Sequence, residues 1–179
     1  MVGISIKNLL AEVGPSFDQP FEMLTACHDR VRRSLDLLVR LRAHLAEHGA
    51  DTQAQQAAAD IQRYFDLAAP HHHEDEERHV FPVLLAQGPA AMQAQVRRLQ
   101  DDHQAMQRAW GPARAVLARV QAGQGGLSPA DQAALDHFAG LYTDHLVLED
   151  EQVYPAALAL LGPDALAQAG TEMASRRQG

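Results

Sequence analysis

The chain has little of several residue types that common functional sites require. Cys27 is the single cysteine among 179 residues, which excludes an internal disulfide and a zinc site built from several thiolates. Lysine occurs once, at Lys7, and the formal net charge is −8. A nucleic-acid or anionic-membrane partner requires clustered positive charge, whereas the arginines are spread along the sequence. No apolar run approaches the ~20 residues of a membrane span. We therefore expect a soluble, cytoplasmic protein with neither partner.

β-Branched residues are also sparse, while alanine, leucine, glutamine and arginine dominate and apolar positions recur at spacings of three and four. This pattern is typical of helices. Glycine-containing breaks at residues 48–51, 87–89 and 123–126 divide the chain between residues 20 and 161 into four long segments. The sequence therefore predicts an all-α fold, an up-down-up-down four-helix bundle in one domain. Residues 1–19 would form an N-terminal arm, and residues 162–179 a short C-terminal helix and tail.

Local signals refine this prediction at a few positions. Ser128 is a helix N-cap candidate, with a proline at the next position and Asp131 placed for a capping box. Three prolines fall inside helical segments, at Pro70, Pro82 and Pro112. Because each lacks a backbone N–H donor, we expect each to kink or end its helix.

Histidine is abundant, with ten in the chain, and a pattern that includes it occurs twice. In each copy a histidine is followed four residues later by a glutamate and ten residues later by a proline. The copies are His72, Glu76, Pro82 and His145, Glu149, Pro155. Residues four apart lie on one helix face, so each copy can direct an imidazole and a carboxylate at one point. A lone histidine precedes each copy, His28 before the first and His103 before the second.

The positions of the breaks indicate that these histidines meet. Short connections make neighbouring helices antiparallel, so residues equally far from a turn lie at the same height. The residue midway between His28 and His72 is Ala50, inside the first break. The midpoints of the next two histidine pairs also fall inside breaks. We therefore expect His28, His72, His103 and His145 in one layer, with both glutamates one helical turn away.

Four buried histidines and two buried glutamates would be costly without a compensating cation. Imidazole and carboxylate ligands without thiolate suit iron, manganese or zinc. Six protein ligands are more than one tetrahedral zinc needs and too few to saturate two octahedral ions. The sequence therefore favours two metals that share the carboxylates and keep an open position.

The same residues resemble the hemerythrin-like, or HHE cation-binding, family of four-helix di-iron proteins, over roughly residues 20–161. The resemblance implies two iron ions joined by an oxo or hydroxo bridge, with zinc or manganese as alternatives. It also implies six metal ligands: His28, His72, Glu76, His103, His145 and Glu149.

The chain departs from the oxygen carriers of this family at one notable position. Those proteins have a fifth histidine one turn after the third-helix histidine, where this chain has Gln107. The carriers also have an aspartate five residues after their last histidine, so Asp150 competes with Glu149 as a ligand, and Glu77 competes more weakly with Glu76. The identical interval from glutamate to proline in the two copies favours Glu76 and Glu149.

Three functions follow as expectations, and whether the protein is an enzyme stays open. The first is a di-iron module that binds dioxygen or a related small molecule, such as nitric oxide or peroxide, for sensing, storage or buffering. The second is an enzyme that acts on peroxide or nitric oxide or repairs damaged iron centres, which the open coordination near Gln107 favours. The third is a structural metal site that holds the bundle together.

Residues beside the predicted ligands receive less specific interpretations. We expect His71 and His73 to be solvated, and His79 to act beside the site or as a cap. Core packing is the expected role of Tyr142, although its hydroxyl could come close to the metals, and of Trp110. The acidic run 74–77 is expected to be a solvated face around one functional glutamate.

Overall fold

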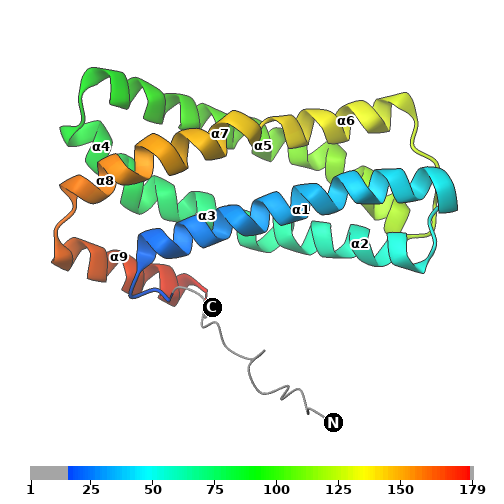
Figure 1. Cartoon of the computed structure of the whole chain (residues 1–179), viewed down its shortest axis with the longest axis horizontal. Helices are drawn as coiled ribbons and strands as arrows, with labels where there is room; N and C mark the ends of the chain where they lie inside the picture. The colour runs from blue at the N-terminus through cyan, green and yellow to red at the C-terminus, as the bar shows by residue number, and fades with distance from the viewer. Residues whose placement is uncertain (1–15, 178–179) are drawn as a thin grey trace, which may run out of the picture.

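A computed structural model describes residues 16–177 of the chain, and every regular element in this range is helical. The helices form four long stretches and a shorter C-terminal helix that lie side by side (Figure 1). The first stretch is α1 (Pro20–His48), and the third is α5 (Ala90–Gln121). The second stretch comprises α2 (Thr52–Arg63), η2 (Tyr64–Ala68), α3 (Ala69–Asp75), η3 (Glu76–Val80) and α4 (Phe81–Gln87). The fourth comprises α6 (Pro129–Gly140), α7 (Thr143–Leu148), η4 (Glu149–Val153) and α8 (Tyr154–Leu160), and α9 (Pro163–Arg176) follows it.

The connections between stretches fall where the sequence predicts them, and their chemistry explains why. Gly49 follows α1 with a φ of 71°, a conformation that glycine adopts without strain. The Asp51 side chain then accepts a hydrogen bond from the backbone N–H of Ala54, which caps α2. Ser128 and Asp131 form the expected capping box at the start of α6. The arm predicted for residues 1–19 lies outside the described residues, apart from 16–19.

Pro70 and Pro82, where we expect the helix to kink or end, lie in a stretch that continues through local changes of helix type. The segments η2, η3 and η4 are π-helical turns, in which backbone bonds run from residue i to residue i−5. Each turn is followed, two residues after its end, by a proline: Pro70, Pro82 or Pro155. Because the wider turn reorganises the local bonding, the missing proline donor interrupts no regular α-helical ladder. Pro112 also lies within an unbroken α5.

The buried apolar residues form two clusters, one at each end of the bundle. On α1, Cys27 belongs to one cluster and Val31 to the other, and His28 lies between them. On α5, His103 lies in the same way between Leu99 and Met106. The histidine layer therefore separates two apolar cores, each of which fixes the helices that carry it.

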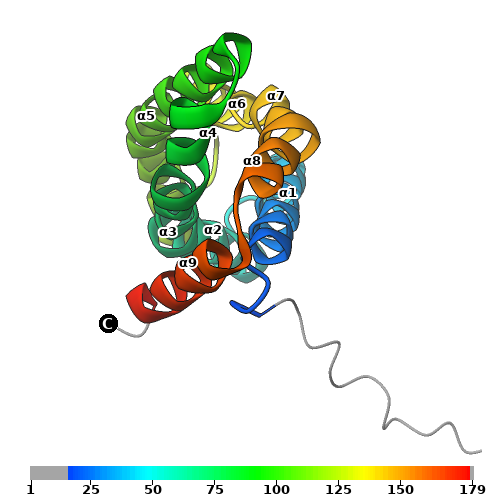
Figure 2. The same cartoon turned by 90° about the vertical axis from the view of Figure 1, so that its left-hand side faces the viewer.

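Helix α9 packs on the outside of the bundle (Figure 2) and is anchored by a buried carboxylate. Asp75 of α3 is fully buried and accepts hydrogen bonds from Arg176 and from Arg177, whose Nη2 lies 2.6 Å from Asp75 Oδ2. His79 contacts Glu172 of α9 at 2.6 Å, so it connects two helices and does not lie in the histidine layer. The expectation that residues 74–77 form a solvated face is therefore wrong for Asp75.

The surface also corrects our expectation that the arginines are spread out. Arg30, Arg33 and Arg40 of α1 line a groove of about 580 Å³ together with Arg63 of α2. This face of an otherwise acidic chain is locally basic. Within residues 16–177, no helix is long and apolar enough to span a membrane.

Candidate metal centre

Each of the four long stretches contributes one histidine to a single buried layer. His28 comes from α1, His72 from α3, His103 from α5 and His145 from α7, and none is more than 7% exposed. Glu76 and Glu149 are fully buried and occupy the first positions of η3 and η4. The structure thus brings together all six residues that the sequence predicts as ligands.

The two glutamates span the layer, and each directs its two oxygens to different histidines. Glu76 Oε1 lies 3.4 Å from His72 Nε2, and Glu76 Oε2 lies 3.4 Å from His103 Nε2. Glu149 Oε2 lies 3.3 Å from His28 Nε2, and Glu149 Oε1 lies 3.2 Å from His145 Nε2. Both carboxylates therefore connect a half of the site that holds His28 and His72 with a half that holds His103 and His145.

These residues form two overlapping groups in which potential ligand atoms lie within 4.8 Å of one another. The first group consists of His28, His72, Glu76 and Glu149, and the second of His103, His145 and Glu149. The second group has fewer members, so a cation there would have fewer protein ligands.

Buried polar atoms at the centre lack partners among the described residues. Both nitrogens of His72, Nε2 of His103 and His145, Oε2 of Glu76 and both oxygens of Glu149 have no hydrogen bond. A buried polar atom without a partner costs about 1–3 kcal/mol, and more if it is charged. Divalent cations in the two groups would satisfy these atoms except Nδ1 of His72, so the residues present fit a pair of metals.

Carboxylates outside the layer orient three of the four imidazoles. The Nδ1 atoms of His28 and His103 donate to Asp150 at 2.8 Å and to Glu77 at 3.0 Å. His145 Nδ1 lies 3.4 Å from Asp102. Such contacts fix which nitrogen faces a metal and raise its basicity. Asp150 and Glu77 thus lie behind the histidines, whereas Glu149 and Glu76 lie between them, which is the arrangement that the glutamate-to-proline interval favours.

The pKa values of the ionisable groups at the centre are shifted far from their usual values. Burial alone would lower the pKa of His28, but contacts with Asp150, Glu149 and Glu76 outweigh it and raise this pKa to about 11. The balance is the same at His103, where burial opposes contacts with Glu76 and Glu77 and the pKa rises to about 10. Burial and neighbouring histidines lower the pKa of His72 to about 3, against the pull of Glu76. Burial opposes ionisation of Glu76, but the surrounding histidines hold its pKa well below the usual range.

Tyr154 takes part in the site, which the sequence analysis did not predict. Its hydroxyl lies 2.9 Å from His28 Nε2 and donates a short hydrogen bond to Glu76. Burial raises the pKa of this tyrosine well above its usual value, so it keeps its proton at neutral pH. The corresponding residue of the first copy is Phe81, which has no hydroxyl. The tyrosine in place of phenylalanine, directly before the shared proline, is the sequence signal that would have identified Tyr154.

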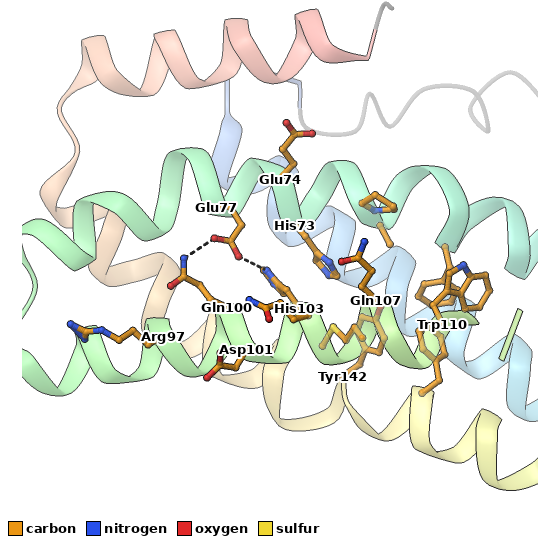
Figure 3. Close-up of a pocket in the computed structure, with 16 residues that line it drawn as sticks. His73, Glu74, Glu77, Arg97, Gln100, Asp101, His103, Gln107, Trp110 and Tyr142 are labelled. Atoms are coloured by element: carbon orange, nitrogen blue, oxygen red, sulfur yellow. Dashed lines mark hydrogen bonds and ion pairs between the residues drawn. The ribbon is translucent and has the colours of Figure 1, made fainter. Parts of the chain in front are cut away.

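His73 also differs from expectation, because it lines a pocket beside the centre rather than the outer surface. Its ring stacks on His103, with centroids 4.0 Å apart and an angle of 11° between the planes. Burial and nearby His103 hold its pKa well below the usual range. Figure 3 shows His73 and Gln107 beside His103. His73 is thus half-buried in the pocket and not among the potential ligands, whereas His71 is not among the residues that line the pocket.

Tyr142 and Trp110 have the packing roles that the sequence predicts, and they also line this pocket. Tyr142 is buried against Phe138, with ring centroids 5.4 Å apart. The Trp110 indole N–H donates to Asp66 at 2.9 Å.

Comparisons with known proteins agree with this geometry. The model of the hemerythrin HHE cation binding domain matches residues 19–157. An uncharacterized protein of Haemophilus influenzae is 31% identical over 163 residues, which cover 91% of this chain and 92% of the relative.

Proposed function

Because the chain belongs to the hemerythrin HHE cation-binding domain family, we propose that its buried centre holds two iron ions and binds dioxygen or a related small molecule. Binding would serve sensing, storage or buffering. We further propose that the helices form an up-down-up-down bundle around this centre, with zinc or manganese as alternative metals.

The unpartnered buried atoms of Glu76, Glu149, His72, His103 and His145 carry this proposal. In it, His28, His72, Glu76 and Glu149 would hold one ion, and His103, His145 and Glu149 would hold the other. A pair of irons supplies electrons for reversible binding or reduction of small oxygen- or nitrogen-containing molecules.

The protein's own groups set the conditions for this chemistry. Asp150, Glu77 and Asp102 orient the imidazoles, and the two apolar clusters exclude water from the two ends of the layer. Tyr154 holds a proton within hydrogen-bond reach of Glu76 and His28, where it can donate to a bound molecule or to a carboxylate oxygen.

Metal analysis combined with visible spectra tests the proposal. Protein purified without added metal should contain about two irons per chain, one for each group of ligand atoms, and should change its spectrum reversibly on exposure to dioxygen. His72→Ala should lose metal, whereas His71→Ala should not. Iron-free protein that holds only zinc, with no spectral response, would instead support a structural metal site.

The sparser second group gives an enzymatic function its specific support. His103 lines the pocket beside Gln107, which stands where the carriers have a histidine, so a cation held by His103 would have an open position that solutes reach. Turnover of peroxide or nitric oxide by the iron-loaded protein, lost in His72→Ala, would favour this function over simple binding. Unchanged peroxide and nitric oxide concentrations would favour the binding module.

A further inference from the structure

A pocket of about 750 Å³ opens beside the candidate metal centre, between α3 and η3 on one side and α5 on the other. Its size falls within the roughly 300–1,000 Å³ typical of sites for small organic molecules. A diatomic gas needs far less space. The volume therefore calls for a larger occupant than the proposed function requires.

One end of the pocket is aromatic. Phe65, Trp110, Phe138 and Tyr142 line it, and the ring centroids of Phe65 and Trp110 lie 5.3 Å apart. Phe65 and Phe138 pack edge to face at 4.9 Å, so these rings support one another. Aromatic walls of this kind favour a flat ring, which can stack on a face or pack against an edge.

The middle of the pocket is polar. His73 and Gln107 lie near each other there, beside His103 (Figure 3). Neither side chain makes a hydrogen bond to another residue in the range 16–177, although both carry donor and acceptor groups. A hydroxyl or carbonyl group on an occupant would find partners at this point.

Charge at the outer part of the pocket limits the occupant further. Glu74, Glu77 and Asp101 line it together with a single arginine, Arg97. Three carboxylates against one guanidinium repel an anion, since like charges raise its cost of entry. Glu74 and Glu77 already contact Arg78 and His103, so they offer little to a cation. The occupant should therefore be neutral.

We propose that this pocket binds a neutral, planar aromatic molecule that carries a hydroxyl or carbonyl group, with its ring near Trp110 and its polar group at His73. Binding requires no metal.

Isothermal titration calorimetry of the full-length, metal-loaded protein with 2-naphthol tests the proposal. We expect saturable binding with one site per chain. Naphthalene-2-sulfonate has the same rings but is an anion, and it should bind at least tenfold more weakly. His73→Phe keeps an aromatic ring but removes the hydrogen bond, and should weaken 2-naphthol binding about tenfold.

Matched variants locate the site. Gln107→Phe narrows the pocket and should weaken binding, whereas Arg108→Phe adds the same ring at the neighbouring position, which does not line the pocket. His71→Phe is the corresponding control for His73→Phe. Circular dichroism and metal analysis on each sample confirm that the fold and metal content are retained.

The outcomes separate this proposal from the proposed function. No saturable binding of 2-naphthol, or equal binding by His73→Phe and His71→Phe, would overturn the aromatic site even if the protein holds two irons. Saturable, His73-dependent binding by protein that holds no iron would support the site while the proposed function fails.

Discussion

Carboxylates behind the histidines determine how well the centre is organised for a metal. Asp150 accepts from His28 at 2.8 Å and from Arg32 at 2.6 Å, so it couples a predicted ligand to an arginine of the same helix. Burial would raise the pKa of Asp150, but His28 and Arg32 lower it, so its carboxylate stays charged near neutral pH.

Asp150→Asn should weaken metal binding about 10–100-fold, because such an orienting contact supports the ligand without itself binding the metal. The fold should persist, since Asp150 is partly exposed. Affinity is measured by competition with a coloured chelator. Asp144→Asn removes the same charge from an exposed position of α7 and should bind metal normally. An affinity equal to wild type in Asp150→Asn would contradict this role.

Tyr154 provides a second test at the residue scale, because its hydroxyl donates a hydrogen bond to the buried carboxylate of Glu76. Removal of a hydrogen bond to a buried charged group costs about 1–3 kcal/mol. Tyr154→Phe should therefore destabilise the metal-free protein by this amount. It should affect the loaded protein less, because the metal also satisfies Glu76.

Thermal unfolding of both forms measures this difference. Tyr64→Phe is the matched control, since the Tyr64 hydroxyl donates to the backbone of Cys27 at 3.3 Å, outside the layer. It should lower both unfolding temperatures equally. Equal shifts in Tyr154→Phe would mean that its hydroxyl does not substitute for a metal contact.

Sequence reasoning works for residues whose position follows from local periodicity. Spacing and turn positions place His28 and His103 in the layer, and the structure agrees. Asp75 was missed because its partners, Arg176 and Arg177, lie about a hundred residues away and no local pattern links them. His73 was missed because the pocket it faces is formed by another helix.

At the scale of elements, the π-helical turns explain the repeated pattern. Three of the buried positions in the first copy, His72, Glu76 and Val80, are each four residues apart. In an α-helix, every such step would rotate the side chain about 40° from its predecessor, given 3.6 residues per turn. The wider turn that begins at Glu76 offsets this drift and keeps the glutamate and the following apolar residues directed inward. The sequence predicted the helical stretches, but proline alone did not reveal how they continue.

Deletion of Arg78, an exposed residue inside η3, should therefore be tolerated. A π-helical turn holds one residue more than an α-helical turn, so the shortened turn can close as α-helix while Val80 and Phe81 stay in their apolar cluster. We expect a small fall in the unfolding temperature and retention of the metal.

Deletion of Arg108, an exposed residue inside the regular helix α5, is the matched control. It rotates the residues that follow by about 100° and moves Ala113 and Leu117 out of their apolar cluster, so it should lower the unfolding temperature much more. If the two deletions unfold at the same temperature, η3 does not accommodate an extra residue.

At the scale of the whole molecule, the bundle holds buried carboxylates and histidines between two apolar cores. Without a metal, protons on the histidines can balance the charge of the carboxylates. In the metal-free protein, His28 and His103 keep their protons to pKa values of about 11 and 10, opposite the carboxylate of Glu76. Both values lie above the roughly 6.5 of an unfolded histidine. Their contribution to stability is complete below about pH 6.5 and is lost as the pH rises toward 10 and 11. His72, whose pKa falls to about 3, contributes in the opposite sense, and its share is lost as the pH falls below about 6.5.

The metal-free protein should therefore be most stable near pH 6.5 and should unfold at progressively lower temperatures from pH 7 to pH 9. The loaded protein should show no such decline, because the cation compensates Glu76 and Glu149 without protons.

Metal binding at pH 8 should also release about two protons, one each from His28 and His103. Calorimetric titrations in buffers of different ionisation enthalpy measure this release, and unfolding curves with and without chelator measure the stability. His44 lies outside the histidine layer and contacts Asp51. His44→Gln should therefore leave the proton release unchanged. Parallel pH profiles for the two forms, with no proton release, would show that the buried histidines are neutral before metal binds.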